Sequence, residues 1–261
     1  MNLQVLVSTM NQEDDSLIKQ MNIRTDAIFI NQCDKNLFEE FEFNNNKIRF
    51  LSFSERGVGL SRNNALMRST AEICLFADDD VVYVDNYEKI VLQAFENNPK
   101  ADVIVFNLTT DEIEGRPAAV INKNGRVKWY NSLKYGTYRI AIRSKRIKEK
   151  NILFSLLFGG GAKYSAGEDV LFITDCLKKG LHIYSDVSVI GHVTHATSTW
   201  FEGYTDKLFY DKGVLFSAIS PMWAKLLCLQ FAIRKRKIFK TDKTFKEAYK
   251  LMIQGTKEFK R

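Results

Sequence analysis

The chain has 261 residues, of which 45% are hydrophobic and 12% aromatic, so it can bury the core of one large domain and is too apolar to be disordered as a whole. Only three prolines occur, with no low-complexity stretch and no fixed repeat, which excludes an array of small linked modules. The formal net charge is +7, and residues 225–261 alone hold 12 basic and 3 acidic residues. A basic tail of this kind favours an anionic partner, either a membrane or a nucleic acid.

The opening residues and the cysteines indicate the compartment. MNLQVLVSTMNQ has no basic segment, no long apolar run and no cleavage site, so we expect a cytoplasmic protein. The cysteines stand singly at Cys33, Cys74, Cys176 and Cys228. They lack the spacing of a zinc site and the density of a disulfide scaffold, so we expect reduced packing residues.

The first 110 residues alternate between predicted strands and helices. Five uniformly apolar runs are typical of strands covered on both faces: residues 3–8, 27–30, 48–53, 73–76 and 103–106. Helical spacing lies between them, in residues 14–21, 60–69 and 86–97. This order predicts an α/β domain with a mainly parallel sheet, in which ligands bind at the carboxyl ends of the strands.

An acidic triplet, Asp78, Asp79 and Asp80, directly follows the fourth of these strands. One interpretation is a solvated turn, because Asp is common where a strand ends. The other is a metal site, because three adjacent carboxylates repel one another beside a low-dielectric core unless a cation binds them. Mg2+ and Mn2+ prefer oxygen ligands, and Mg2+ often completes its shell with phosphate and water.

Beyond residue 111 the chain becomes more polar. Residues 115–128 predict a hairpin turning at Asn124-Gly125, and residues 139–150 carry six Lys or Arg, which favours either a phosphate site or a solvated face. A Gly-rich loop then leads through Glu168 and Asp169 into a helix that we expect to end at Gly180. A strand over 182–190 precedes two histidines, His192 and His195.

Taken together, these motifs resemble family 2 glycosyltransferases of the GT-A fold, of the bacterial surface-polysaccharide type. The resemblance covers about residues 1–200 and rests on Ser8-Thr9 at the end of the first strand, GLSRNNAL at 59–66, the acidic triplet, Gly167-Glu168-Asp169 and His195, in that order. It implies a GT-A-like domain over 1–205, with a nucleotide-sugar half (1–110) and an acceptor half (111–205). A basic, amphipathic helical extension over 206–261 would follow.

The resemblance also implies a donor site. Asp80 with Asp78 would reach Mn2+ or Mg2+, the ribose and the diphosphate of a nucleotide sugar, with Asp79 beside them. His195 matches a position that often ligates the metal, and His192 is the alternative, since residues i and i+3 of an extended segment face opposite sides. The nucleotide-binding positions would be Ser8, Thr9, Asn11, Gln32 and Arg62.

Two of these expectations leave alternatives. Arg62 suits a phosphate, but it could instead pair with Glu55 or with an Asp of the triplet. After the second strand, many relatives carry an acid in a Ser/Thr-rich turn, whereas this chain has Asn31-Gln-Cys-Asp34. That departure leaves the nucleotide base open, with UDP the first choice.

For catalysis, the resemblance implies that Asp169 is the general base of an inverting transfer, which takes the proton of an acceptor hydroxyl. Glu168 would orient the acceptor or support Asp169, although the two roles could be exchanged.

The tail admits two interpretations. Residues 213–233 are strongly apolar but contain Pro221 and Lys225, and the basic run 234–237 follows. We expect an interfacial membrane segment with Trp223 and Phe231 at the lipid boundary; the alternative is a helix packed on the domain.

The sequence thus predicts a metal-dependent glycosyltransferase that is peripheral on the inner face of the cell membrane. It would take a saccharide acceptor, for which the family suggests a polyprenyl-diphosphate-linked glycan, and we expect no nucleic-acid partner. The alternatives are a nucleotidyltransferase of similar fold, and a catalytically idle domain whose basic tail binds a membrane or nucleic acid.

Overall fold

The computed structural model describes residues 1–110, 120–194 and 203–259. The chain divides into two compact units. The first comprises Met1–Leu156 and Glu168–Ala196, and the second comprises Leu157–Gly167 and Thr197–Arg261. Among the described residues, no helix is both long and apolar enough to cross a membrane.

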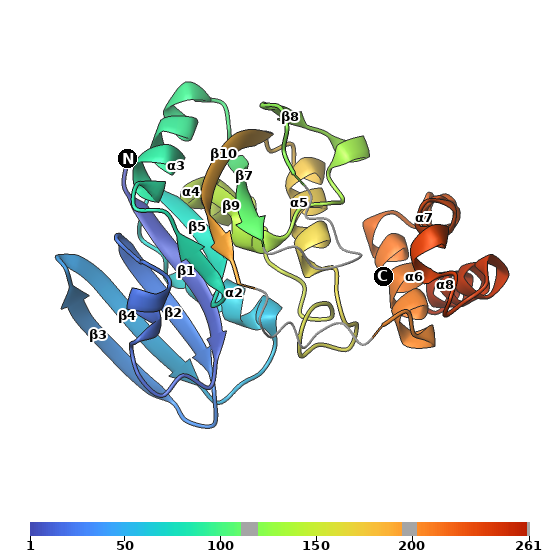
Figure 1. Ribbon diagram of the computed structural model, residues 1–261, viewed down its shortest axis with the longest axis horizontal. Coiled ribbons are helices and arrows are strands. Elements are labelled where there is room, and N and C mark those ends of the chain that lie inside the picture. Colours follow the sequence, from blue (N-terminus) through green and yellow to red (C-terminus); the bar gives the residue numbers. More distant parts are fainter. Residues whose placement is uncertain (111–119, 195–202, 260–261) are drawn as a thin grey trace. The chain divides into compact units, whose positions relative to one another are not determined.

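The first unit is built on one large sheet, which has ten strands within the described residues (Figure 1). Along the sheet they run β3-β4-β2-β1-β5-β9-β7-β10-β6, with β8 paired to β10. Their bounds are β1 Leu3–Met10, β2 Asp26–Gln32, β3 Leu37–Phe43, β4 Asn46–Phe53, β5 Ile73–Asp78, β6 Val81–Tyr83, β7 Val103–Thr110, β8 Gly125–Val127, β9 Ile140–Arg143 and β10 Ile183–Val193.

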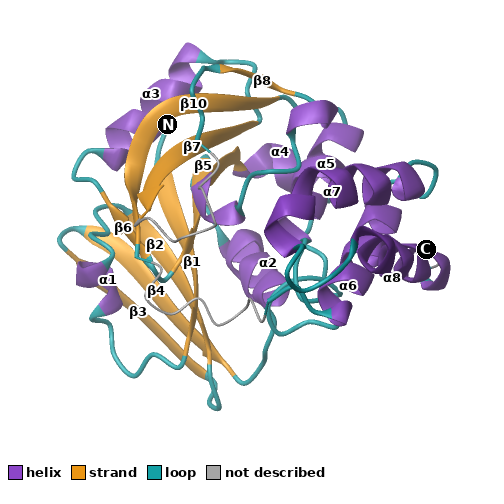
Figure 2. Cartoon of the chain, turned by 45° about the vertical axis from the view of Figure 1, so that its right-hand side comes forward, coloured by secondary structure: helices purple, strands orange, loops and turns teal. Residues whose placement is uncertain are grey.

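Helices cover both faces of this sheet (Figure 2). One core joins the sheet to α1 (Leu17–Gln20) and α3 (Tyr87–Asn97). The other joins it to α2 (Val58–Arg68), α4 (Ser144–Glu149) and α5 (Glu168–Lys178). Because both faces are covered, the central strands are uniformly apolar, as the sequence predicted, and the α/β fold is confirmed.

The strand directions differ in part from the expectation. Parallel pairing joins β4, β2, β1 and β5, and it also joins β7 to β10. The remaining pairs are antiparallel, so the sheet is mixed. The short strand β9 lies antiparallel between β5 and β7 and separates the two parallel groups.

Two hairpin expectations changed. The sequence analysis did not predict β3. This strand pairs with β4, and the turn between them is formed by Asn44 and Asn45, both at positive φ. The turn predicted at Asn124-Gly125 is wrong: β8 begins at Gly125 and pairs with β10, and Asn124 accepts a hydrogen bond from Val187 N. The rest of that predicted hairpin, up to residue 119, lies outside the described residues.

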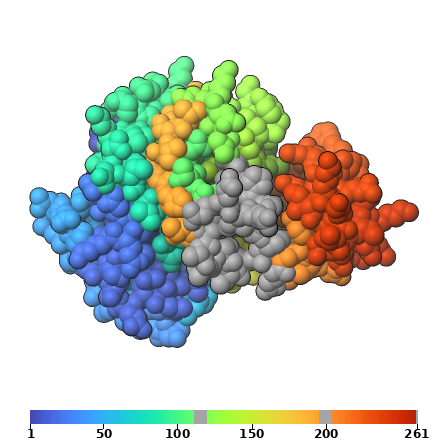
Figure 3. All heavy atoms as spheres, in the orientation of Figure 1, coloured from blue at the N-terminus to red at the C-terminus, as the bar shows by residue number. Residues whose placement is uncertain are grey.

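β10 is only half covered. It forms the orange band at the surface in Figure 3, and Val187 and Val189 on its middle part are exposed.

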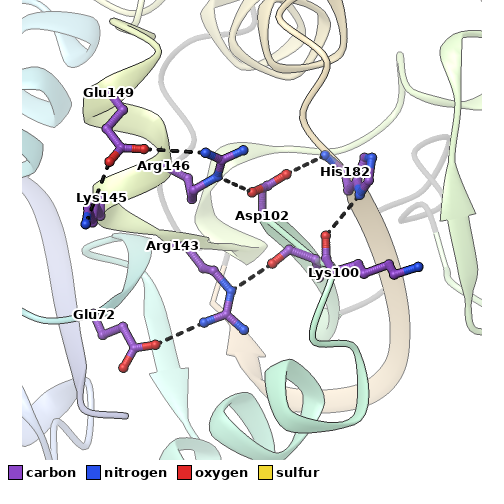
Figure 4. A network of polar contacts seen from close by, with 9 residues as sticks. Glu72, Lys100, Asp102, Arg143, Lys145, Arg146, Glu149 and His182 are labelled. Carbon is purple, nitrogen blue, oxygen red and sulfur yellow. Dashed lines mark hydrogen bonds and ion pairs between the residues drawn. The ribbon is translucent and has the colours of Figure 1, made fainter.

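The basic run 139–150 is largely used inside the fold (Figure 4). Arg143 donates to Glu72 and to the Ala101 carbonyl, and Arg146 donates to Asp102 at 2.9 Å. Asp102 also accepts from the backbone N–H of His182. These pairs tie β9 and α4 to the neighbouring strands, so Arg143 and Arg146 stabilise the fold.

Among the described residues, the second unit contains a loop over 157–167 and three packed helices: α6 Asp206–Ile219, α7 Ala224–Phe239 and α8 Phe245–Glu258. Two glycines permit close contact between α6 and α8. A Cβ on Gly213 would lie 1.9 Å from the Met252 carbonyl oxygen, and one on Gly255 would lie 2.2 Å from that of Tyr210. Asp211 of α6 accepts from Ser165 through both the backbone N–H and the hydroxyl, which fixes the loop 157–167 to α6.

The apolar segment 213–233 is not one interfacial helix. It divides at Pro221 into the end of α6 and the start of α7, and residues 213–219 are buried. Phe231 is also largely covered and contacts Phe216. Only the part from Met222 onward presents large apolar side chains to solvent.

Candidate active site

The candidate residues converge at one edge of the sheet because the strands that carry them are in register. Ser8 of β1 lies opposite Asp78 of β5, and Thr9 lies opposite Asn31 of β2. This edge holds the carboxyl ends of the parallel strands, where ligands collect in open α/β sheets.

The acidic triplet forms the turn between β5 and β6, as the first interpretation had it, but each member is held differently. Asp78 ends β5 and accepts from Arg62 Nη2 at 2.7 Å. Asp79 accepts from the Thr9 hydroxyl at 2.6 Å. The backbone carbonyl of Asp80 accepts from Thr194 N at 2.9 Å, which joins the turn to the end of β10.

Electrostatics in this turn penalise negative charge. Burial, followed by the charges of Asp78 and Asp79, raises the pKa of Asp80 to about 6. Burial also raises the pKa of Asp79, and the hydrogen bond from Thr9 opposes that shift. A bound cation would remove this penalty, so the turn has the electrostatic property that a metal site requires.

Arg62 of α2 joins the triplet to the second acidic motif. Its Nη1 donates to Glu168 at 2.8 Å while its Nη2 donates to Asp78, and its side chain is 5% exposed. Burial opposes the guanidinium charge, but Asp78 and Glu168 together raise the pKa of Arg62. Of the alternatives for Arg62, the structure therefore shows pairing with an Asp of the triplet, and it adds Glu168.

The other residues of GLSRNNAL explain why Arg62 is so placed. A Cβ on Gly59 would lie 2.4 Å from the Ser155 carbonyl oxygen, so glycine lets α2 approach residues 154–155 closely. The Asn63 amide exchanges two hydrogen bonds with the backbone of Phe154. The Phe154 ring lies under the Arg62 guanidinium at 5.6 Å and stacks on Phe172 of α5.

Glu168 and Asp169 open α5. Both lie in its first turn, where the N-terminal end of the helix stabilises negative charge. Glu168 is committed to Arg62, whereas Asp169 accepts from the backbone N–H of Val170 at 2.7 Å. Both acids are partly exposed, and they differ in their partners: Glu168 is held in an ion pair with the buried Arg62, whereas Asp169 caps its own helix turn.

The predicted nucleotide-binding residues form a connected set. Gln32 accepts from Gly57 N at 2.7 Å, and Asn11, at φ 52°, donates its backbone N–H to the Gln32 carbonyl. Ser8, by contrast, is buried and hydrogen-bonds the Ser61 hydroxyl at 2.8 Å, so its side chain holds α2 against β1.

The two histidines give different outcomes. His192 lies in β10, and its Nδ1 hydrogen-bonds the Thr109 hydroxyl at 2.9 Å. His195 lies outside the described residues. Among residues 1–110, 120–194 and 203–259, no three His, Cys, Asp or Glu side chains are grouped as a metal cage. The donor set instead fits a cation held by one or two carboxylates and completed by phosphate and water, which is the usual arrangement for Mg2+.

The sequence analysis missed Tyr138 and Arg139. They lie in a 3-10 turn, η2 (Thr137–Arg139), that packs against β5. Burial raises the pKa of Tyr138, the Arg139 charge opposes the shift, and the negative charges of Asp78, Asp169 and Asp80 add to it. A Cβ on Gly136 would lie 2.5 Å from the Tyr138 ring, so the glycine defines the ring position. The Gly-Thr-Tyr-Arg stretch in a basic and aromatic segment was the one available signal.

A cavity of about 410 Å³ lies beside the β1–α1 loop and the β3–β4 hairpin. Its lining includes Glu13, Asp14, Asp15 and Glu39 against a single Lys35, and none of the residues discussed above. Four carboxylates disfavour a diphosphate, so this cavity is distinct from the candidate site.

Comparison with known proteins agrees with this geometry. A family model described as glycosyl transferase family 2 matches residues 15–153. Curated proteins give no significant match.

Solved structures resemble the chain along most of its length. Residues 1–349 of TarS from S. aureus, in complex with UDP-GlcNAc, match with a TM-score of 0.68 and 14% identity, covering 98% of this chain and 82% of that one. The same fragment with UDP matches with a TM-score of 0.63 and 16% identity, covering 98% and 81%. Mannosyltransferase PcManGT from Pyrobaculum calidifontis, in complex with GDP-Man and Mn2+, matches with a TM-score of 0.52 and 11% identity, covering 97% and 70%.

At such identities the structural matches establish the fold, while the family model covers more than half of the chain. The match also decides against the nucleotidyltransferase alternative. The chain therefore belongs to glycosyl transferase family 2 and is a glycosyltransferase with the GT-A fold.

Proposed function

We propose that the protein transfers a sugar from a UDP-linked donor to a saccharide hydroxyl, with inversion at the anomeric carbon and with Mn2+ or Mg2+ as cofactor. The observation that carries this proposal is the bridge from Asp78 through the buried Arg62 to Glu168. It joins Asp78, which we assign to the donor site, to Glu168, which we assign to the acceptor site. The complexes of TarS with UDP-GlcNAc and of PcManGT with GDP-Man and Mn2+ support a nucleotide-sugar donor and a divalent metal.

For the donor, we assign Thr9, Asn11, Gln32 and Asp79 to the nucleotide, with Ser8 supporting them from the sheet. Asp80 and the free oxygen of Asp78 would hold the metal, together with His195. Thr194, which precedes His195 in the sequence, donates to the Asp80 carbonyl. A bound divalent cation would stabilise the charge that develops on the departing diphosphate.

Arg62 has a different task from the one first expected. Both of its terminal nitrogens are engaged by carboxylates, so we assign it to positioning Asp78 and Glu168. The positive charge of its guanidinium also compensates the negative charges of these two carboxylates.

For the transfer, the acceptor oxygen attacks the anomeric carbon as the bond from that carbon to the diphosphate oxygen breaks. Asp169 would take the acceptor proton, because the carboxylate of the neighbouring Glu168 is already held in an ion pair with Arg62. Glu168, held by Arg62, would orient the acceptor. We further propose that the acceptor is a lipid-linked glycan of capsule, O-antigen or another cell-surface polysaccharide, met at the cytoplasmic face of the membrane.

The test is calorimetric titration with UDP, GDP and CDP, with and without Mn2+, of the wild type, Asp80→Ala and Asp175→Ala. Asp175 is a matched control because its carboxylate forms an ion pair with Lys178, three residues further along α5. We expect metal-dependent binding of UDP that Asp80→Ala loses and Asp175→Ala keeps. Equal binding to wild type and Asp80→Ala, or no binding of any nucleotide, would overturn the assignment.

A further inference from the structure

The helix α7 has two apolar faces. One contains Ala224, Cys228, Ala232 and Phe239 and is buried. The other is exposed: Leu226 is 54% and Ile233 is 61% exposed, seven residues apart and therefore on one side of the helix. At the turn before α7, Met222 is 78% and Trp223 is 53% exposed. Large apolar side chains gathered in this way mark an interaction surface.

The same helix carries unbalanced positive charge. From residue 224 to 240 the chain has six basic residues and no acidic one: Lys225, Arg234, Lys235, Arg236, Lys237 and Lys240. All six are exposed, and none forms an ion pair with any described residue. Elsewhere in this unit, basic residues do pair, as Lys207 does with Asp211 and Lys243 with Asp206. The charge of α7 is therefore available to a partner.

We propose that this surface, made of Met222, Trp223, Leu226, Ile233 and the six basic residues, docks on an anionic lipid bilayer with α7 lying in the plane of the interface. Apolar side chains enter the headgroup boundary while lysine and arginine reach the anionic headgroups. Tryptophan is characteristic of that boundary. A nucleic acid would match the charge but would leave the apolar row in water, so the bilayer is the partner that complements both features.

This inference deepens the proposed function and rests on it only for the lipid-linked acceptor. Docking would hold the enzyme where such an acceptor is presented. The surface itself is argued from α7 and its preceding turn alone.

Vesicle co-sedimentation of the full chain tests the proposal, with vesicles of phosphatidylcholine alone or of equimolar phosphatidylcholine and phosphatidylglycerol. We expect binding to the anionic vesicles that weakens with salt. The triple variant Trp223→Ser/Leu226→Ser/Ile233→Ser should lose at least about tenfold in affinity. Replacing Arg234, Lys235, Arg236 and Lys237 by Gln should lose about fivefold for each charge removed.

Matched controls are Tyr130→Ser, an exposed aromatic of the other unit, and Lys246→Gln/Lys250→Gln on α8. Both should bind as the wild type does. Circular dichroism confirms that each variant folds, and UDP titration without vesicles reports donor binding separately, so failure of docking and failure of the glycosyltransferase assignment are distinguishable.

Three outcomes would overturn the proposal. The first is equal binding to neutral and anionic vesicles, or binding that the α7 variants leave unchanged. The second is affinity for duplex DNA that falls in the charge variant but not in the apolar variant. The third is a self-associated dimer, seen by ultracentrifugation, that dissociates in the apolar variant without any vesicle binding by the wild type.

Discussion

Arg62 and Glu168 lie 106 residues apart in the sequence and form a buried ion pair of 2.8 Å between Nη1 and Oε1. The second nitrogen of the same guanidinium holds Asp78. Each acidic motif is therefore positioned by Arg62, a residue of a third segment, α2. A displacement of α2 should move the side chains of both motifs.

The first prediction concerns this bridge. Arg62→Leu should destabilise the fold by about 3 kcal/mol, because it leaves the largely covered Glu168 and the partly exposed Asp78 without a compensating charge. Chemical denaturation gives the free energy of unfolding. The matched control is Arg56→Ala, which breaks the exposed pair with Asp34 and should cost about 1 kcal/mol or less. Equal costs for the two variants would show that the bridge contributes no more than a surface pair.

The bridge also shows which features of the site could be predicted from the sequence and which could not. The strands, the helices and the order of the acidic motifs could be predicted, because uniform apolar runs and local spacing are properties of short segments. The pairing of Arg62 with Glu168 depends on how α2 and α5 meet around Phe154, which no local pattern encodes. Tyr138 could not be predicted for the same reason, because the packing of η2 against β5, the strand that ends at Asp78, is a tertiary contact.

The differences between prediction and structure at β3 and at residues 213–219 also have a physical cause. β3 reads LFEEFEF, and most of it is exposed at the sheet edge, so it lacks the apolar run that identified the central strands. In the tail, residues 213–219 are apolar because they are buried among protein, and composition alone cannot separate that from a lipid-facing segment.

A second prediction follows from Asp80. Its pKa in the folded protein, about 6, lies above the ordinary value of 3.8, so the folded state binds the proton more tightly than the unfolded state does. Stability should therefore fall as the pH rises from about 4 to about 6 and show no further loss from this group above that. In EDTA, Asp80→Asn should be more stable than the wild type at pH 7.5, on the order of 1 kcal/mol because the side chain is partly exposed.

Thermal unfolding between pH 4 and pH 7.5 measures this effect, and the advantage of Asp80→Asn should disappear toward pH 4. If the variant were instead less stable by the same amount at every pH, Asp80 would be a structural residue of the turn.

The third prediction separates the two acids of α5. Asp169→Asn should lower kcat by about 10²–10⁴-fold, the range for loss of a general base, with donor binding and stability retained. The asparagine oxygen can still accept from Val170 N, so the first turn is preserved. Glu168→Gln should lose stability by about 1–3 kcal/mol, because it removes a charged partner of Arg62. If Glu168→Gln abolished turnover without loss of stability while Asp169→Asn stayed active, the two roles would be exchanged.

The fourth prediction concerns Tyr138. A tyrosine is protonated at neutral pH, and burial raises the pKa of Tyr138 further, so its hydroxyl can donate a hydrogen bond within the site. Tyr138→Phe should lower kcat/KM by about tenfold, as expected for a bond to a charged group. Gly136→Ala should act in the same direction by displacing the ring, whereas Tyr130→Phe, on an 83% exposed side chain, should leave turnover unchanged. Full activity of Tyr138→Phe would remove the phenol from the site.

The fifth prediction concerns the contact between α6 and α8. Gly213→Ala should destabilise the helical unit by about 2 kcal/mol or more, because the new methyl group meets the Met252 carbonyl. Gly125→Ala is the control, since no atom lies within 4 Å of its Cβ position. Thermal unfolding followed by circular dichroism compares the two, and equal midpoints would mean that the helices separate easily.

The second unit takes one of its two segments, Leu157–Gly167, from the stretch of chain immediately before Glu168 and Asp169. Within that unit, Phe158 and Tyr164 contact Phe259 near the end of α8, and Ser165 is held by Asp211. A chain shortened at residue 205 would leave these three side chains without these partners. They lie 4 to 11 residues before Asp169, the proposed base, in the sequence. The C-terminal helices are thus a poor choice for removal or exchange between relatives, and a chimera that keeps 157–167 should keep its own residues 206–259 as well.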